Sequence, residues 1–367
     1  MKIRSITTYP LAIPVKRVIK MARQTVRQTE TLIVKIVSDE GITGFGEIAA
    51  ALHMSGETLM STKYIIDRYL TPVLIGQDPF NIEKIHLLFN RLMAHNTGVR
   101  AAIDIALYDL MGRALKVPVY RLIGGRVRDD IRVTWHLANS DYDLDLEEAQ
   151  RGLDQGFEVM KFKVGTANRS QELKTLEGLR KRFESLDLRL DANQSLQITE
   201  AVSFIKKTEP YGITFFEQPL NYRQLAGMAR VCASVDVPIA ADEGIFTADD
   251  VVANYEAKSA DIISLKLMKA GGITGVLRAA QVCRVLGFPI HLAAKIAETS
   301  VSTAAAAHVG VALPTLEYDG GTTNHYLQED IVFEPLLPVG GRLRPTEKPG
   351  LGVDVDEAKL TRFLTNI

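Results

Sequence analysis

Residues 186–219, LDLRLDANQSLQITEAVSFIKKTEPYGITFFEQP, contain the repeating unit that decides the fold. Two short strand-like segments, LDLRLDAN at 186–193 and ITFFEQP at 213–219, flank a helical pattern at 198–208. Strand-like segments of this kind recur about every 25–30 residues over the region that begins near Ile131. The other six are IRVTWHLA, VMKFKV, VPIAADE, ADIISLKLMK, FPIHLAAK and LPTLEYD.

Eight strands that alternate with helices predict an α/β fold, a parallel (β/α)8 barrel of the TIM type. An open doubly wound sheet has the same alternation of elements. However, no G-x-G-x-x-G motif opens a helix after the first strand of the repeat. The absence of this motif disfavours a dinucleotide-binding sheet.

The N-terminal part of the chain follows a different pattern. Residues 2–12 and 31–38 alternate or are rich in β-branched side chains, and EGITGFGE at 40–47 supplies a glycine-rich turn. A long stretch with a helical period then continues to about Lys116. A run of strands followed by a run of helices indicates a separate α+β domain at residues 1–125.

The barrel is predicted to span residues 126–330, and residues 331–367 follow its last strand. This tail is expected to be an extended wrap until DEAKLTRFL, because proline interrupts helices. Its four prolines are Pro335, Pro338, Pro345 and Pro349.

The composition excludes several classes of protein. The 367 residues are 46% hydrophobic and 24% charged, with a net charge of −1, so neither a nucleic-acid surface nor a membrane surface is indicated. No apolar run approaches the roughly 20 residues of a membrane span. The N-terminus lacks the features of a signal peptide, and Cys232 and Cys283 are expected to be buried thiols, so a cytoplasmic location is expected.

Charged residues stand where the predicted barrel strands end, and the C-terminal ends of the strands carry the active site in barrels of this type. Three consecutive strands end on one carboxylate each, Asp191, Glu217 and Asp242. Three such groups at one barrel mouth repel one another unless a cation lies between them. All-oxygen ligation suits Mg²⁺, with Mn²⁺ as an alternative, and leaves positions for substrate oxygens.

Lysines end the strands on both sides of these carboxylates. Lys161 and Lys163 are two residues apart, so both face the same side of their strand, and Lys266 ends the sixth strand. A divalent cation on a carboxylate stabilises the enediolate that forms when the adjacent carbon loses its proton. Lys163 and Lys266 would lie on opposite faces of that carbon, and nearby cations would lower the pKa of an amine base. This is the pattern that general enzymology associates with enolase-type sites.

The chain resembles the enolase superfamily, specifically its muconate-lactonizing (muconate cycloisomerase) subgroup. The matching segments are KFK (161–163), DANQ (191–194), EQP (217–219), ADE (241–243), KLMKAGG (266–272), AAIDIALYDLMGRALKVPVYRLIGG (101–125) and KPGLGVDVDEAKL (348–360). The resemblance implies that the N-terminal domain and the tail form a cap over the barrel mouth. It also implies a homo-oligomer, either a dimer or an octamer.

The resemblance assigns roles to the strand-end residues. Asp191, Glu217 and Asp242 would bind magnesium, and Lys163 and Lys266 would be the acid/base pair. Lys161 would neutralise the carboxylate of a small-molecule substrate, and Asn193 would contact the site from the third strand.

The reaction within the subgroup depends on other positions. Lys295 stands where the subgroup has Ser or Thr, and it is a candidate for a second anionic group of the substrate. Glu317-x-Asp319 resembles the Asp-x-Asp of dipeptide epimerases. Trp135 is a candidate for the pocket floor. Further substrate-binding candidates in the cap loops are Arg23 and His53.

Racemisation or epimerisation of an amino acid derivative, either an N-acyl amino acid or a dipeptide, is the favoured isomerase reaction. A muconate-type cycloisomerisation and an o-succinylbenzoate synthase-like dehydration are the alternatives. A barrel that only binds ligands would lack a metal ligand or a lysine, and this chain retains all of them.

Overall fold

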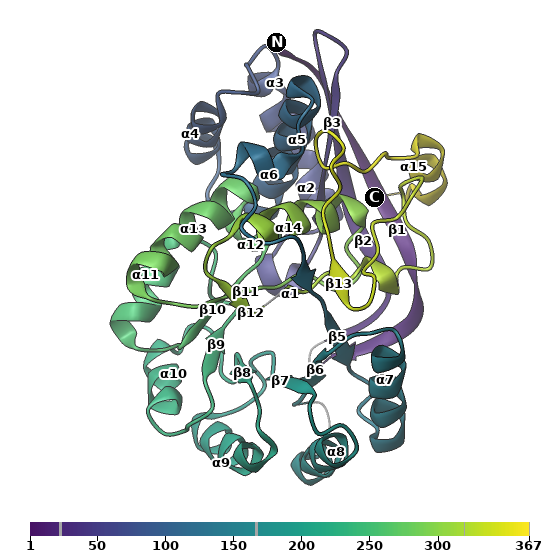
Figure 1. The fold of residues 1–367 in the computed structure, drawn as a ribbon. Coiled ribbons are helices and arrows are strands. Elements are labelled where there is room, and N and C mark those ends of the chain that lie inside the picture. Colours follow the sequence, from purple (N-terminus) through teal and green to yellow (C-terminus); the bar gives the residue numbers. More distant parts are fainter. Residues whose placement is uncertain (22–23, 166–167, 319, 367) are drawn as a thin grey trace.

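The computed structural model describes residues 1–21, 24–165, 168–318 and 320–366. It consists of a barrel and a cap that lies against one end of it (Figure 1). The predicted sites at Arg23 and Asp319 lie outside the described residues. No helix in the described ranges has the length and apolar character needed to cross a membrane.

The barrel contains eight parallel strands in sequential order, as the sequence predicts. They are β5 (Thr134–Leu137), β6 (Val159–Lys163), β7 (Asp187–Asp191), β8 (Phe215–Glu217), β9 (Ile239–Ala241), β10 (Ile262–Leu265), β11 (Ile290–Leu292) and β12 (Leu316–Tyr318). Between the first and last strands, Thr134 N donates a hydrogen bond to Gly320 O at 3.2 Å. This contact links the two ends of the sheet.

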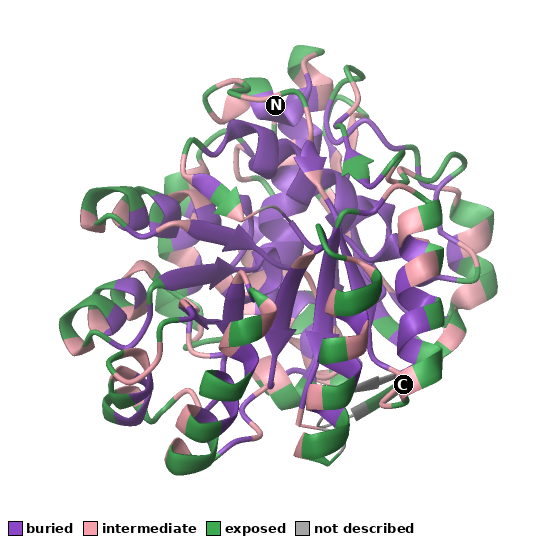
Figure 2. Cartoon of the chain, turned by 60° about the horizontal axis from the view of Figure 1, so that its bottom comes forward, coloured by how far each residue is buried: buried purple, intermediate pink, exposed green. Residues whose placement is uncertain are grey.

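Helices cover the outside of the barrel. They are α7 (Tyr142–Asp154), α8 (Arg169–Arg182), α9 (Ile198–Thr208), α10 (Leu225–Cys232), α11 (Ala248–Ala257), α12 (Leu267–Ala270), α13 (Ile273–Leu286) and α14 (Ser300–Ala312), with a 3-10 turn η2 (Glu209–Tyr211). Figure 2 shows buried strands surrounded by helices whose outer faces are exposed. Both cysteines, Cys232 and Cys283, are free thiols in this shell.

The cap begins with an antiparallel sheet of β1 (Ile3–Met21), β2 (Gln24–Ser38) and β3 (Thr43–Ala49). The first two strands extend well beyond the expected ranges 2–12 and 31–38. Near the far end of β1, Lys16 Nζ donates to His325 O at 2.9 Å, so the long hairpin reaches the barrel.

The helical part of the cap follows the sheet. Its elements are α1 (Leu52–Ser55), α2 (Leu59–Ile65), the π-helix η1 (Ile66–Leu70), α3 (Thr71–Leu74), α4 (Ile82–Leu92), α5 (Thr97–Leu115) and α6 (Val119–Leu122). Helix α5 is apolar on most of its circumference and is largely buried, as expected for such a helix. A Cβ added at Gly46 of β3 would lie 1.9 Å from Ala102 O of α5, so glycine permits this close packing.

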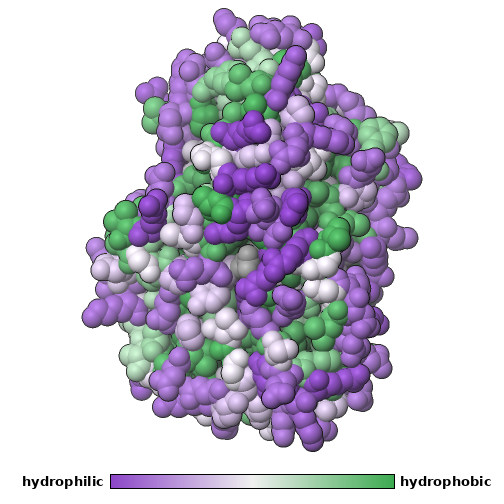
Figure 3. Space-filling view, in the orientation of Figure 1, coloured by the Kyte–Doolittle hydropathy of each residue, from purple (hydrophilic) through white to green (hydrophobic). Residues whose placement is uncertain are grey.

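The tail returns to the cap. The 3-10 turn η3 (Asn324–Tyr326) precedes it, and its own elements are β13 (Arg342–Leu343), which pairs with β4 (Ile131–Arg132), and α15 (Glu357–Phe363). Lys35 of β2 forms an ion pair with Glu357 at 2.5 Å, and Thr365 N donates to Pro10 O at 3.0 Å. On the face in Figure 3, hydrophilic and hydrophobic side chains are interspersed over both parts of the molecule.

Candidate active site

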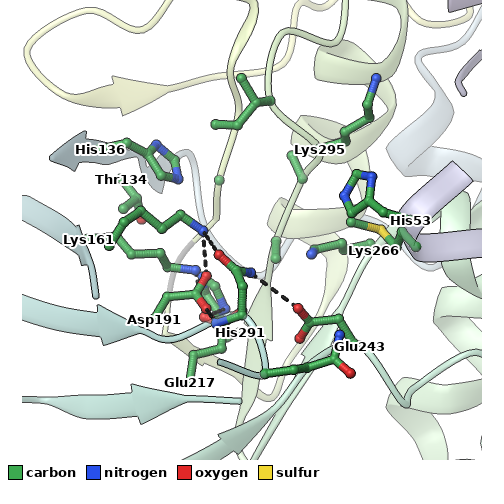
Figure 4. A pocket seen from close by; sticks show the side chains of 18 residues that line it. His53, Thr134, His136, Lys161, Asp191, Glu217, Glu243, Lys266, His291 and Lys295 are labelled. Atoms are coloured by element: carbon green, nitrogen blue, oxygen red, sulfur yellow. Dashed lines mark hydrogen bonds and ion pairs between the residues drawn. The ribbon is translucent and has the colours of Figure 1, made fainter. Parts of the chain in front are cut away.

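A cavity lies at the C-terminal ends of the barrel strands, with His53 and Met54 of the cap on its rim. Most of the predicted site residues line it. They are Lys161, Lys163, Asp191, Asn193, Glu217, Lys266 and Lys295, together with His53. Asp242 lies directly behind this wall, buried against Lys266. Figure 4 shows Lys161, Asp191 and Glu217 on one side of the cavity and Lys266 facing them.

Each strand-end carboxylate is paired with a lysine. Lys161 Nζ lies 2.6 Å from Glu217 Oε2, and Lys163 Nζ lies 2.6 Å from Asp191 Oδ2. Across the cavity, Lys266 Nζ lies 2.5 Å from Asp242 Oδ2.

Two further contacts hold this arrangement. Lys163 Nζ donates to Asn193 Oδ1 at 3.0 Å. Lys269 Nζ lies 2.7 Å from Asp242 Oδ1. The two lysines expected to act as bases are therefore held at fixed positions on opposite sides of the carboxylates.

Burial and the neighbouring lysines shift the pKa values of the carboxylates in opposite directions. Burial alone would raise the pKa of Asp191, but Lys163 and Lys161 reverse this effect and lower it. Lys266 and Lys269 likewise lower the pKa of Asp242. For Glu217, burial and the neighbouring carboxylates outweigh Lys161, so the pKa is raised.

Carboxylates surround the side chain of Lys266. Burial disfavours its ammonium form, but Asp242, Glu217 and Glu243 outweigh burial and raise its pKa. The charges closest to Lys266 are carboxylates, and they stabilise its ammonium form.

The chemistry of this donor set fits a divalent metal ion. Four buried acids meet here, and burial together with Asp242 and Asp191 raises the pKa of Glu243 to about 7. The Glu243 Oε2 atom is buried without a hydrogen-bond partner. In the described ranges no three acidic, His or Cys side chains are already arranged as a metal cage, because ammonium groups engage the carboxylates. A divalent cation would relieve the electrostatic repulsion among these carboxylates.

The backbone is strained at the ends of these strands. Asn193, Gln194 and Gln218 have φ of 41°, 66° and 36°, and Ala297 after β11 has φ of 63°. Left-handed backbone at non-glycine residues is uncommon and tends to concentrate at functional sites, where the surrounding structure maintains it. The strain here supports a functional role for the cavity rim.

Two predicted pocket residues lie elsewhere. Trp135 points out of the barrel, where its Nε1 donates to Glu148 Oε1 of α7 at 2.6 Å and its ring stacks on His325. Glu317 is exposed and does not line the cavity. In each case the adjacent residue points inward, His136 on β5 and Tyr318 on β12, because alternation places neighbours on opposite faces.

Several residues that line the cavity were not predicted from the sequence. Thr134 and His136 form the inner face of β5, and His291 lies at the cavity base, where its Nδ1 is 3.0 Å from Ser264 Oγ. The alternation of Thr134 and His136 about Trp135 was the available signal, but it required knowing which face of the strand points inward.

Comparison with known proteins identifies the family of this chain. Residues 4–124 match the model of the mandelate racemase / muconate lactonizing enzyme N-terminal domain, and residues 145–359 match the enolase C-terminal domain-like model. The chain belongs to the mandelate racemase / muconate lactonizing enzyme family. It is thereby an enzyme of the enolase superfamily, and its characterised relatives are isomerases.

Members of the mandelate racemase / muconate lactonizing enzyme family match along nearly the whole chain. N-succinyl-L-Arg/Lys racemase of Bacillus cereus is 32% identical, covering 98% of this chain and 97% of the relative. L-Ala-D/L-Glu epimerase of Bacillus subtilis is 33% identical, covering 96% and 97%. The crystal structure of a muconate lactonizing enzyme from Pseudomonas fluorescens superposes with a TM-score of 0.96, at 32% identity and 99% coverage of both chains.

Proposed function

We propose that this protein transfers a proton at the carbon adjacent to a carboxylate, as a racemase or epimerase of an N-acyl amino acid or a dipeptide. The observation that carries the proposal is the order of the strands. Lys163 on β6 and Lys266 directly after β10 flank the three intervening strands, whose ends supply Asp191, Glu217 and Asp242.

Asp191, Glu217 and Asp242 would hold Mg²⁺, or Mn²⁺ in its place. Enzymes of this family generally depend on Mg²⁺. When bound, the ion supplies positive charge for the oxygens of the substrate carboxylate.

The lysines supply the proton-transfer groups. Lys161, paired with Glu217 on the wall of the cavity, would bind the substrate carboxylate and fix its orientation. One of Lys163 and Lys266, as the neutral amine, would accept the α-proton from its own side. The other, as the ammonium, would donate a proton to the opposite face, so the configuration inverts without net consumption of protons.

The relatives support amino acid derivatives as substrates, because an N-succinylamino acid racemase and a dipeptide epimerase are both among them. Cycloisomerisation of a muconate-like diacid is the second candidate. A muconate lactonizing enzyme and an N-succinyl Arg/Lys racemase both superpose with a TM-score of 0.96, so the fold supports this reaction equally. Both reactions use the same lysines, so substrate turnover must distinguish them.

A deuterium-exchange experiment tests the proposal. The protein with Mg²⁺ in D₂O is given N-acyl amino acids, dipeptides and muconate, and α-exchange is followed by NMR. Exchange with inversion at Cα is expected for at least one amino acid derivative. Lys163→Ala should lower the exchange rate of one enantiomer by roughly 10²-fold or more. Lys266→Ala should lower the exchange rate of the other enantiomer by a similar factor.

Lys207→Ala is the matched control, since Lys207 is exposed on α9. This variant should retain exchange of both enantiomers. Folded protein that exchanges no amino acid derivative but lactonizes muconate would replace the proposal with its alternative. Equal loss of exchange for both enantiomers in each lysine variant would contradict the two-base arrangement.

The assembly and location of the protein are not needed for this chemistry and stay predictions. A homo-oligomer, either a dimer or an octamer, is expected, and size-exclusion chromatography with light scattering measures it. A cytoplasmic location is likewise expected, and cell fractionation tests it.

A further inference from the structure

Four lysines line the cavity, and one differs from the rest in its charge partners. Lys161, Lys163 and Lys266 each engage a strand-end carboxylate at 2.5–2.6 Å. Lys295 has no carboxylate of the described residues within 4.0 Å of its Nζ atom. Its side-chain hydrogen bond goes to a neutral hydroxyl, Thr29 Oγ1, at 3.4 Å.

Surrounding structure fixes the position of Lys295. Thr323 Oγ1 donates to the carbonyl oxygen of Lys295 at 2.6 Å. Two residues later, Ala297 has a left-handed φ of 63°, which sets the direction of the loop. On the cap side, Thr29 of β2 is buried. The ammonium group is therefore held at the junction of cap and barrel.

The acids nearest to Lys295 do not supply a full counter-charge. Burial lowers the pKa of Lys295, while Glu298, Glu47 and Glu30 favour its ammonium form. Burial and Glu47 raise the pKa of Glu298 to about 8, so Glu298 carries a proton near neutral pH. Glu47 is engaged by the backbone N–H groups of Thr299 and Ser302, and Glu30 is exposed, where solvent screens its charge.

We infer that Lys295 binds a second carboxylate of the substrate, remote from the reacting carbon, so that the preferred substrate is a dicarboxylate. Lys295 is half-buried, and a cation partly removed from water is stabilised when a ligand supplies the opposite charge. Figure 4 shows Lys295 and His53 on the side of the cavity away from Asp191 and Glu217. A substrate whose first carboxylate lies at the strand-end cluster would thus present its other end to Lys295. This inference rests on the proposed function.

Two kinds of amino acid derivative carry such a carboxylate. It can belong to the acyl group, as in an N-succinylamino acid, or to an acidic side chain, as in a dipeptide ending in glutamate. Each has a neutral isostere of the same shape, the N-succinamoyl amino acid and the dipeptide ending in glutamine. The preference for acid over isostere isolates the effect of the remote charge.

The test measures this preference in wild type and in Lys295→Met, which keeps the length of the side chain and removes its charge. In wild type with Mg²⁺, kcat/KM for α-exchange should favour the acid of at least one pair. Lys295→Met should reduce that ratio by roughly 10- to 100-fold, as expected for a hydrogen bond between charged groups. The pair that shows the loss identifies the position of the second carboxylate.

Lys207→Met, at an exposed position on α9, is the control for loss of one positive charge and should leave the ratio unchanged. Lys295→Gln serves as the second variant if Lys295→Met lacks native circular dichroism. An equal preference in wild type and in a folded Lys295 variant overturns the inference and leaves the proposed function intact.

A binding measurement separates the inference from the proposed function. Calorimetric titration of the same acid and isostere pairs reports the subsite even if no compound exchanges its α-proton. In one outcome no compound exchanges its α-proton, yet wild type binds the acids more tightly than Lys295→Met does. That outcome would overturn the proposed function alone. Absence of any acid preference in binding overturns the inference.

Discussion

The carboxylate of Glu47 connects the cap to the barrel, and its removal should destabilise the protein strongly. Glu47 lies on β3 and is 1% exposed. It accepts hydrogen bonds from Thr299 N at 2.9 Å, Thr299 Oγ1 at 2.7 Å and Ser302 N at 3.0 Å. These groups form the N-terminus of α14, where unpaired N–H groups and the helix dipole favour an anion. Thr31 Oγ1 donates a further bond at 2.8 Å.

The magnitude follows from the groups that Glu47→Ala leaves without a partner. Two buried backbone N–H groups, those of Thr299 and Ser302, would lose their acceptor at a cost of about 1–3 kcal/mol each. Loss of the anion at the helix terminus adds about 0.3–2 kcal/mol. Thr31 Oγ1 retains a bond to Ile48 O at 3.0 Å, so it adds little. The expected loss of unfolding free energy is about 2–8 kcal/mol, a large part of a typical value.

Urea denaturation followed by far-UV circular dichroism measures this loss. Glu47→Gln keeps the shape and one acceptor oxygen, so it should lose less stability than Glu47→Ala. Glu256→Ala, at an exposed position on α11, is the matched control and should change stability by less than about 0.5 kcal/mol. A loss below about 1 kcal/mol for Glu47→Ala would refute the assignment of Glu47 as the acceptor for α14.

Two further changes test the packing and the charge at the same junction. Glu298→Gln removes a group whose pKa is raised to about 8 from 4.5, so the folded wild type binds more protons in that window and loses stability as pH rises through it. Between about pH 5 and about pH 8, the unfolding free energy of the variant should rise relative to that of wild type by on the order of 3 kcal/mol. Equal pH profiles of the two proteins in urea denaturation would contradict this. Gly46→Ala would place a Cβ 1.9 Å from Ala102 O, so β3 and α5 must separate. The unfolding free energy should fall by about 3 kcal/mol or more. An unchanged midpoint of thermal unfolding would show instead that the contact can relax.

Much of the fold and the chemical core of the site could be predicted from the sequence. Eight strand-like segments alternating with helices sufficed for the barrel. Because parallel strands end at one mouth, Asp191, Glu217, Asp242, Lys163 and Lys266 could be placed together from their positions alone. The lengths of β1 and β2 were underestimated. Their distal halves gain partners from the barrel, as at Lys16, and local pattern does not report such contacts.

The facing of individual side chains was decided by tertiary structure. Sequence alternation shows that neighbours in a strand point to opposite faces, but the closure of the barrel determines which of them points inward. Trp135 and Glu317 therefore point away from the cavity, and His136 and His291 line it.

The charge state of the site was also settled only by three-dimensional proximity. The sequence predicts which charged groups lie at the mouth. It does not predict that Asp242 would be the nearest charge to Lys266 and raise its pKa, because Coulomb energy depends on distances of a few ångströms between residues distant in the chain. The sequence by itself thus determined the elements, the three strand-end carboxylates and the pair of lysines. The inward faces, the ion pairs and the contact of Lys295 with a neutral hydroxyl were determined by how the closed barrel and its cap bring those elements together.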